Sequence, residues 1–165
     1  IRIMTKSAHI VINLNTQELH LACDDGSHHR YAVSTAANGP GERNGSECTP
    51  RGLHQIHQKF GDDCEVNTVF VGRRPTGECY TPKLRKQHPE RDWILTRILW
   101  LTGREPGRNL GGDVDTLARY IYVHGCPDDV SFAESGSHGC IRMRNTDVID
   151  LYDRVEVGTL VEIKE

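Results

Sequence analysis

The sequence has no long hydrophobic segment. Its longest apolar stretch, from Trp93 to Leu101, is interrupted by Thr96 and Arg97. A transmembrane helix needs about 20 consecutive apolar residues, so we expect no membrane-spanning helix and no membrane partner. Internal repeats are also missing from the sequence, which argues against a repeat architecture.

The sequence also lacks a large excess of charge of either sign. Its 20 Lys and Arg residues and 23 Asp and Glu residues are interspersed and give a net charge of −3. Proteins that bind nucleic acid usually carry a basic stripe along one face, so we expect no nucleic-acid partner. The glycine-rich segment from Asn38 to Ser46 is no phosphate-binding loop, because no helix pattern follows it. We expect no cofactor.

A chain of 165 residues can close one hydrophobic core. We therefore expect a single domain over residues 1–165. No charged and then apolar signal segment precedes the first predicted strand. Because the chain begins with Ile1 rather than Met, two alternatives stay open: the protein is made without an export signal, or the signal was removed.

Hydrophobic alternation predicts a mostly β fold. The predicted strands cover residues 8–14, 18–23, 29–34, 52–57, 66–71, 120–123 and 159–163, the last as an edge or partner strand. Two helices are expected, one over residues 93–101 capped by Asp92 and one capped by Asn145. We expect an antiparallel β-sandwich or open barrel with one or two packed helices.

Two further segments carry candidate functional residues. His54 and His57 would point to opposite faces of a strand, so they cannot meet one metal ion, and we expect both at the surface. The Pro-rich, basic segment 72–92 has two interpretations. It is either a solvated loop, as charge runs usually are, or a lid that carries cations toward an acidic ligand.

The chemistry-bearing residues gather in one stretch, from Tyr120 to Asn145. A short aromatic and β-branched run at 120–123 predicts a buried strand that ends on His124 and Gly125. Thirteen residues after His124, the sequence reads Ser-His-Gly-Cys over residues 137–140. A thiol, two imidazoles and accessible amide groups are the components of a cysteine acyl-transfer site.

A nucleophilic Cys140 needs a base, because a free thiol is only slightly ionised at neutral pH. His124 and His138 are the two candidates. His138 is close to Cys140 in sequence, whereas His124 comes from a separate strand end and can face the sulfur. The backbone N–H groups of Gly139 and Cys140 would bind the oxyanion, and each donor would contribute roughly 3–4 kcal/mol.

This stretch resembles the signature of the YkuD-type L,D-transpeptidases. In that family a His-Gly pair precedes a Ser-His-Gly-Cys-(Ile/Val)-Arg-Met motif by somewhat more than a dozen residues. Upstream segments at 9–20, 31–35 and 49–52 also resemble the family's opening strands and turns, so the resemblance covers most of the chain. This sequence departs from the family at Cys126, where the family usually has Thr, and in a short interval between the two halves of the signature.

The resemblance implies a role for each residue of the signature. Cys140 would be the nucleophile and His124 the general base, with the Gly125 carbonyl orienting the imidazole. The remaining residues of the motif would support the substrate or the oxyanion; they are Ser137, His138, Gly139 and Arg142.

The resemblance also implies the reaction. The thiolate would attack the L,D bond between meso-diaminopimelate and the terminal D-Ala of a peptidoglycan tetrapeptide. Water would then release a tripeptide, as in an L,D-carboxypeptidase, whereas a second stem would give a 3-3 cross-link, as in an L,D-transpeptidase. We expect hydrolysis in the cytoplasm during peptidoglycan recycling, with a muropeptide tetrapeptide as partner. The alternative is cross-linking or D-amino-acid exchange in the periplasm.

The cysteine count supports the expected location in the cytoplasm. The sequence has six cysteines, and if Cys140 stays a free thiol, an odd number remains. An odd number does not pair completely in an oxidising compartment. We interpret Cys23, Cys48, Cys64 and Cys79 as small, inert hydrophobic residues.

Three alternatives remain. The pairs His124/Cys126 and His138/Cys140 offer two imidazoles and two thiolates to a structural zinc ion, although the spacing within each pair is shorter than usual. A second alternative is a domain that binds wall peptides without turning them over. The presence of both His124 and Cys140 argues against it. Cys126 either fills the position of the usual Thr or forms an inactivating disulfide with Cys140.

Overall fold

The computed structural model describes residues 8–132 and 136–165. In this part of the chain the elements are β1 (His9–Asn13), β2 (Glu18–Ala22), β3 (His28–Ser34), β4 (Gly52–Phe60), β5 (Thr68–Val71), β6 (Arg74–Cys79), α1 (Pro82–Gln87), β7 (Ile94–Gly103), the 3-10 helix η1 (Gly112–Val114), β8 (Tyr122–Gly125), β9 (Ile141–Met143), α2 (Asn145–Arg154) and β10 (Leu160–Lys164). The predicted mostly β fold with packed helices is confirmed. No helix in the described residues is both long enough and apolar enough to cross a membrane.

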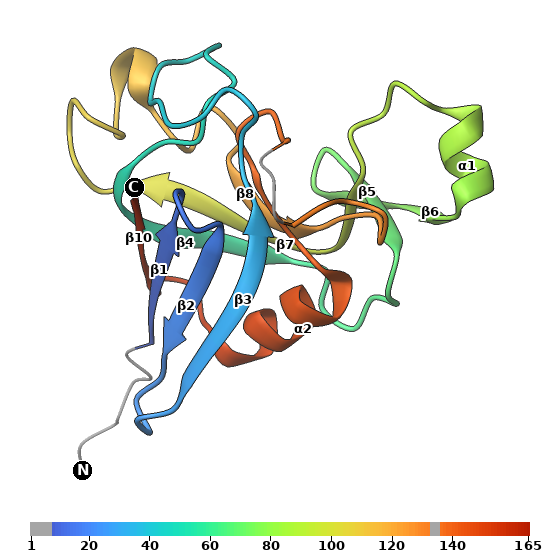
Figure 1. Ribbon diagram of the computed structural model, residues 1–165, viewed down its shortest axis with the longest axis horizontal. Helices are drawn as coiled ribbons and strands as arrows, with labels where there is room; N and C mark the ends of the chain where they lie inside the picture. Colours follow the sequence, from blue (N-terminus) through green and yellow to red (C-terminus); the bar gives the residue numbers. More distant parts are fainter. Residues whose placement is uncertain (1–7, 133–135) are drawn as a thin grey trace.

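Eight of the described strands form a closed barrel in the order β4-β10-β1-β2-β3-β9-β8-β7, which the pairing of β4 with β7 completes. Most neighbouring strands are antiparallel, but β1–β10 and β8–β9 are parallel. Of the two architectures expected, the barrel is present, in closed rather than open form (Figure 1). The segment 159–163, expected at an edge or beside a partner, contributes to β10 between β4 and β1.

The barrel interior is filled by the alternate side chains of its strands and by one face of α2. The buried cluster includes Ile10, Ile12, Leu19, Leu21, Val33, Leu99, Val123, Ile141, Met143, Val148, Leu151 and Tyr152. The helix predicted after Asn145 is confirmed as α2, but the predicted capping residue is wrong. Arg144 occupies the N-cap position, and Asn145 is a buried helical residue.

The predicted helix over residues 93–101 is wrong, because this segment forms β7. Strand β7 is paired on both sides and seven of its ten residues are buried. A strand buried on both faces reads as a continuous apolar run and loses the alternation that identifies most strands. An irregularity in the pairing between Leu95 and Ile98, with Thr96 at φ 76°, disturbs the alternation further.

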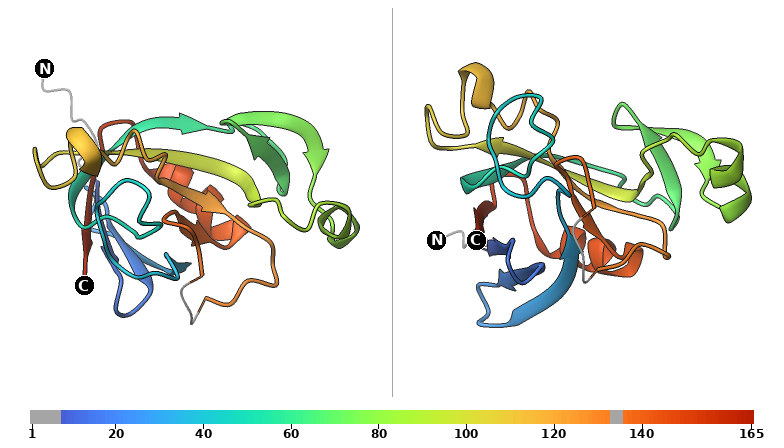
Figure 2. Two further views of the ribbon diagram at one scale, coloured as in Figure 1. Left: turned by 90° about the horizontal axis from the view of Figure 1, so that it is seen from above. Right: turned by 45° about the horizontal axis from the view of Figure 1, so that its top comes forward.

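Segment 72–92 is more ordered than a solvated loop. It contains most of the β5–β6 hairpin and α1, which Thr81 caps through a hydrogen bond from the Leu84 N–H. The hairpin and α1 project from one side of the barrel in all the views (Figures 1 and 2).

The expectation that His54 lies at the surface is also wrong. Its side chain is fully buried on β4, where Nδ1 lies 3.0 Å from the Gly52 carbonyl oxygen and Nε2 lies 2.9 Å from the Thr116 hydroxyl oxygen. These two partners satisfy both ring nitrogens and make the burial of a polar residue possible. Burial lowers the pKa of His54 to about 4.

Candidate active site

The parallel pairing of β8 with β9 brings the two halves of the signature together. Val123 lies opposite Ile141, and His124 lies opposite Arg142. Continued by one residue, this register places Cys140 beside Tyr122. Because alternate residues of a strand share a face, the side chains at 122, 124, 140 and 142 lie on one face, and Val123 and Ile141 point into the barrel core.

The same register sets the separation of the two reacting groups. His124 is two residues further along β8 than Tyr122, the neighbour of Cys140. The Cα atoms of His124 and Cys140 are therefore about 8 Å apart. Side chains that rise from one face can close this separation. The structure thus places His124 as the histidine that shares a strand face with the thiol.

The thiol of Cys140 is held by backbone groups of the strand beside it. The Tyr122 N–H donates to Sγ at 3.3 Å, and Sγ lies 3.5 Å from the Tyr120 carbonyl oxygen. Although the residue is partly exposed, desolvation of its sulfur raises the thiol pKa to about 12. The resting group is therefore a neutral thiol that must lose its proton during attack.

His124 is buried and oriented by its own strand end. Nδ1 lies 2.6 Å from the Gly125 carbonyl oxygen. A carbonyl oxygen only accepts hydrogen bonds, so Nδ1 carries the proton and Nε2 is the proton-accepting nitrogen. Burial lowers the imidazole pKa. At neutral pH the ring is consequently neutral, in the tautomer that a base for the thiol requires.

The Gly125 position leaves no space for a side chain. A Cβ atom there would lie 2.4 Å from Asn145 Oδ1 and 2.6 Å from the Leu95 carbonyl oxygen. Asn145 itself closes the end of β8, since Oδ1 accepts from the Thr96 hydroxyl at 2.7 Å and Nδ2 donates to the Cys126 carbonyl at 3.0 Å. Sequence reasoning assigned Asn145 only a capping role and missed this one.

The turn before Cys140 is fixed by hydrogen bonds from Ser137 and Thr49. Ser137 Oγ donates to the Cys140 carbonyl at 2.5 Å and accepts from the Gly139 N–H at 3.2 Å. Thr49 Oγ1 donates to the Gly139 carbonyl at 2.9 Å. Gly139 has φ 129°, and a Cβ atom there would lie 3.1 Å from Ile121. The Gly139 N–H, an expected oxyanion donor, is thus already bonded within the turn.

The other two motif residues point in different directions. The side chain of His138 is 71% exposed and its Nδ1 lies 3.6 Å from Glu47. Arg142 is partly buried and donates to the Ser34 hydroxyl at 3.0 Å. Its guanidinium also lies against Gly136, where a Cβ atom would be 2.5 Å away. Arg142 therefore links the Cys140 strand to β3.

Arg119 is a basic residue near the thiol that sequence reasoning missed. Its guanidinium donates to the Cys48 carbonyl at 2.6 Å, to the Glu42 carbonyl at 3.2 Å and to the Gly41 carbonyl at 3.3 Å. The positive charge favours the thiolate of Cys140, although it does not overcome desolvation. Only its position just before the predicted strand at 120–123 could have drawn attention to it.

A sequence profile of the YkuD family, described as the L,D-transpeptidase catalytic domain, matches residues 7–163. The chain belongs to the YkuD family. "Probable L,D-transpeptidase YbiS" of Escherichia coli (strain K12) is 30% identical over 114 residues, which are 68% of this chain and 36% of YbiS. "Probable L,D-transpeptidase ErfK/SrfK" of the same strain is 28% identical over 124 residues, 75% of this chain and 39% of that protein. This YkuD-family chain thus spans less than half the length of these two relatives.

Solved structures of L,D-transpeptidases share the fold. L,D-transpeptidase 3 from Mycobacterium tuberculosis, in complex with a faropenem-derived adduct, has a TM-score of 0.60 and 16% identity, over 97% of this chain and 61% of that one. An L,D-transpeptidase from Mycobacterium smegmatis has a TM-score of 0.56 and 18% identity, over 97% and 59%.

The departure from the YkuD signature at Cys126 is accommodated without a disulfide. The thiol is buried and donates to the Met143 carbonyl at 3.2 Å, and burial raises its pKa to about 12. When the β8–β9 register is continued, Cys126 lies four residues beyond Tyr122, the neighbour of Cys140. The Cα atoms of Cys126 and Cys140 are therefore about 14 Å apart. Disulfides need Cα atoms within about 7 Å, so the alternative of an inactivating bond between them is wrong.

The alternative zinc site is not assembled in this YkuD-family structure. Within residues 8–132 and 136–165, no three His, Cys, Asp or Glu side chains converge as metal ligands. His124 uses Nδ1 for the Gly125 carbonyl, and His138 points toward Glu47.

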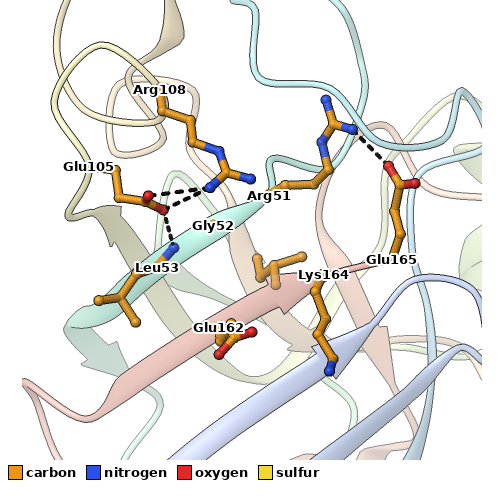
Figure 3. Close-up of a pocket in the computed structure, with 9 residues that line it drawn as sticks. Arg51, Gly52, Leu53, Glu105, Arg108, Glu162, Lys164 and Glu165 are labelled. Carbon is orange, nitrogen blue, oxygen red and sulfur yellow. Dashed lines mark hydrogen bonds and ion pairs between the residues drawn. The ribbon is translucent and has the colours of Figure 1, made fainter.

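A charged hollow lies elsewhere on the barrel, between β4, the end of β10 and the loop after β7 (Figure 3). Four of its charged residues form two ion pairs. Glu105 accepts from the Leu53 N–H at 2.7 Å and pairs with Arg108, and Arg51 pairs with Glu165 at 2.7 Å. None of the signature residues lines it, so we assign it no part in the reaction.

Proposed function

We propose that this protein is a cysteine acyl transferase that cleaves the L,D bond between meso-diaminopimelate and the terminal D-Ala of peptidoglycan tetrapeptides. The single observation that carries the proposal is the shared face of β8 and β9. On it, a neutral His124 with Nε2 free to accept a proton stands near a thiol that needs a base. Membership of the YkuD family supports the substrate class.

The first half-reaction forms a thioester. His124 Nε2 accepts the Cys140 proton as Sγ bonds to the scissile carbonyl carbon, and the carbonyl electron pair moves to oxygen. Collapse of this intermediate breaks the C–N bond, and the imidazolium returns the proton to the leaving amine of D-Ala. Arg119 favours the developing negative charge on sulfur. The Gly139 N–H would serve the oxyanion by exchanging its 3.2 Å bond to Ser137 for one to the substrate.

The second half-reaction decides between the two activities. In hydrolysis, water gives one proton to His124 Nε2 while its oxygen bonds to the thioester carbon. The C–S bond then breaks and the sulfur recovers the proton. In transpeptidation, an amine of a second stem replaces water. We propose hydrolysis as the main outcome, in the cytoplasm, and this preference rests on the odd number of cysteines left beside Cys140.

Helix α1, in the second half of segment 72–92, is proposed as a cover for the substrate. A groove between α1 and the loop after β8 is lined by Tyr80, Arg85, Lys86 and Asp128. Arg85 of α1 pairs with Asp129 of that loop, so α1 and the loop that follows β8 are tied across the groove. Tetrapeptide stems carry several carboxylates, which basic residues at this position would attract.

The test is mass spectrometry of products formed from a disaccharide tetrapeptide under reducing conditions, with Cys140→Ala as control. Loss of D-Ala without dimer formation would establish an L,D-carboxypeptidase. Cross-linked or D-amino-acid-exchanged products would establish a transpeptidase and favour the periplasm. Equal amounts of product from wild type and Cys140→Ala would overturn the proposal in both forms.

A further inference from the structure

Two residues with unfavourable backbone conformations place their side chains against each other beside the active site. Arg73 has φ 65° and Tyr120 has φ 55°. This left-handed region disfavours residues with bulky side chains and is ordinarily occupied by Gly or Asn. Such conformations cluster at functional sites, where the surrounding structure maintains them. Both residues are therefore candidates for a function that depends on their side chains.

The strain at Arg73 arises in the tight turn of the β5–β6 hairpin. Val71 pairs with Arg74, so Gly72 and Arg73 form a two-residue turn, with φ 57° and 65°. Turns with positive φ at both positions strongly prefer Asn-Gly, Asp-Gly or Gly-Gly. An arginine in this place has no advantage for the turn itself.

The side chain of Arg73 lies on an aromatic surface. Its guanidinium carbon is 4.4 Å from the ring centroid of Trp100 and 5.3 Å from that of Tyr120, and Nη1 donates to the Tyr122 hydroxyl at 3.0 Å. Trp100 and Tyr120 are stacked, with centroids 6.1 Å apart. We call these four residues the Arg73 platform. Cation–π contacts and one hydrogen bond thus fix the guanidinium plane before any ligand arrives.

The platform adjoins the nucleophile. The Tyr122 N–H donates to Cys140 Sγ, which also lies 3.5 Å from the Tyr120 carbonyl. Tyr122 belongs to a buried cluster against which Trp100 and Cys140 both pack. Tyr122 therefore contacts both groups, the guanidinium through its hydroxyl and the thiol through its N–H.

Arg73 also keeps donor capacity that Arg119 has used, since Arg119 is bonded to three backbone carbonyls. Arg142 likewise donates to a single hydroxyl, that of Ser34, but its guanidinium lies against Gly136 rather than on the aromatic surface beside the thiol. Among the described residues, Arg73 shows one hydrogen bond, to a neutral hydroxyl, and no carboxylate partner. A guanidinium has five N–H donors in a planar fork that fits a carboxylate.

We propose that the Arg73 platform binds the free α-carboxylate of the terminal D-residue that is cleaved from the substrate. This inference rests on the proposed function. In such a peptide the carboxylate carbon lies only three bonds, or about 4 Å, from the scissile carbonyl carbon. When that carbonyl is at the Cys140 sulfur, the carboxylate lies beside the side chains that surround the thiol, and Tyr122, whose N–H contacts the sulfur, carries Arg73 on its hydroxyl. The platform thus selects stems that end at the residue to be removed.

The test compares Arg73→Asn with the control Arg74→Asn, which changes the neighbouring residue, an exposed one at the start of β6. Asn tolerates positive φ, so Arg73→Asn should melt at or above the wild-type temperature. Two substrates are used, a tetrapeptide ending in D-Ala and the same peptide ending in D-alaninamide. For the acid, kcat/KM should fall about 10- to 100-fold in Arg73→Asn, as expected for loss of a charge-assisted hydrogen bond. For the amide it should change less than about threefold, and Arg74→Asn should match wild type on both.

Suppose that turnover depends on Cys140 and that Arg73→Asn lowers kcat/KM equally for the acid and the amide, or for neither of them. That result would overturn carboxylate binding by the platform and leave the proposed function intact. Equal turnover by wild type and Cys140→Ala would overturn the proposed function. In that event the test of the platform is calorimetry, which measures the affinity of each peptide for Cys140→Ala and for the double variant that also carries Arg73→Asn. Tighter binding of the acid that Arg73→Asn abolishes would support carboxylate recognition, and equal binding of both peptides would refute it.

Discussion

Acidification between pH 6.5 and 4 should destabilise the fold through His54. The ring is completely buried and its pKa lies at about 4, compared with 6.5 for an unperturbed histidine, because desolvation disfavours the charged form. In the unfolded chain His54 binds a proton near pH 6.5, whereas in the folded barrel it does not until the pH approaches 4. The unfolded state therefore binds more protons in this window, and the stability due to neutral His54 decreases as the pH falls.

The size of the effect follows from the two pKa values. A difference of about 2.5 pKa units corresponds to about 3 kcal/mol once the pH is below both values. Between pH 7.5 and pH 5 the expected loss from this residue is about 2 kcal/mol. The loss appears as a steeper fall in unfolding free energy for wild type than for a protein without the ring.

The measurement is urea unfolding of wild type and His54→Gln at pH 7.5, 6 and 5. At pH 7.5 His54→Gln should be the less stable protein, because the hydrogen bonds to Gly52 and Thr116 are disturbed. By pH 5 the difference between the two proteins should have shrunk by about 2 kcal/mol. His124, whose pKa is also lowered, contributes to both proteins equally and cancels in the difference. A difference that stays constant over this range would refute the assignment.

His124→Ala should lower kcat/KM at least 100-fold, as loss of a general base does, whereas His138→Ala should cost less than about tenfold; the reverse order in steady-state kinetics would contradict the orientation seen here. Alkylation of Cys140 by iodoacetamide should be slow at pH 7 and accelerate toward pH 12, because the resting thiol is neutral; a rate already at its plateau at pH 7 would show a preformed thiolate. Cys126→Thr should retain activity and leave peroxide sensitivity unchanged, as assayed by residual turnover, since Cys126 lies too far from Cys140 to bond to it. Asn145→Ala should cost about 2–4 kcal/mol in urea unfolding because buried partners lose their hydrogen bonds; a loss below about 1 kcal/mol would count against its role at the end of β8.

The β segments near the N-terminus could be predicted because each is buried on one face only. In β1 and β2, alternate residues such as Ile10 and Leu19 point into the barrel, and the residues between them are exposed or half-buried. That alternation is a local property of the chain. The helix α2 was predicted for the same reason, since Val148 and Leu151 lie on its one buried face.

β7 could not be predicted from the same rule because its environment is set by segments far away in the sequence. The strand pairs with β4, β5 and β8, and side chains on both of its faces are buried. A single run of sequence cannot show whether the second face will be covered. The burial of His54 has the same origin, since its partner Thr116 lies in a distant segment.

The shared face of His124 and Cys140 could be predicted because both residues belong to one short stretch of the sequence. Once a strand ends on His124 and a tight turn precedes Cys140, parallel pairing of β8 with β9 is enough to place them on one face. Arg119 and Arg73 could not be predicted, because their proximity to Cys140 depends on loop and hairpin geometry. For Arg73 the relevant signal is its backbone conformation, which the residue type alone does not reveal.

The division between these two groups of residues matches a division in the fold. His124 lies on β8 of the closed barrel and Cys140 directly precedes β9, and the packed interior of the barrel holds both positions fixed. Arg73 and Arg85 lie on the β5–β6 hairpin and α1, which project from the barrel and, among the described residues, add no side chain to its main buried cluster. We expect substitutions in this projecting part to change which peptide ends are accepted without disturbing the barrel. We therefore expect substrate choice and reaction chemistry to respond to different substitutions: the acid–amide comparison on Arg73→Asn measures the first, and Cys140→Ala measures the second.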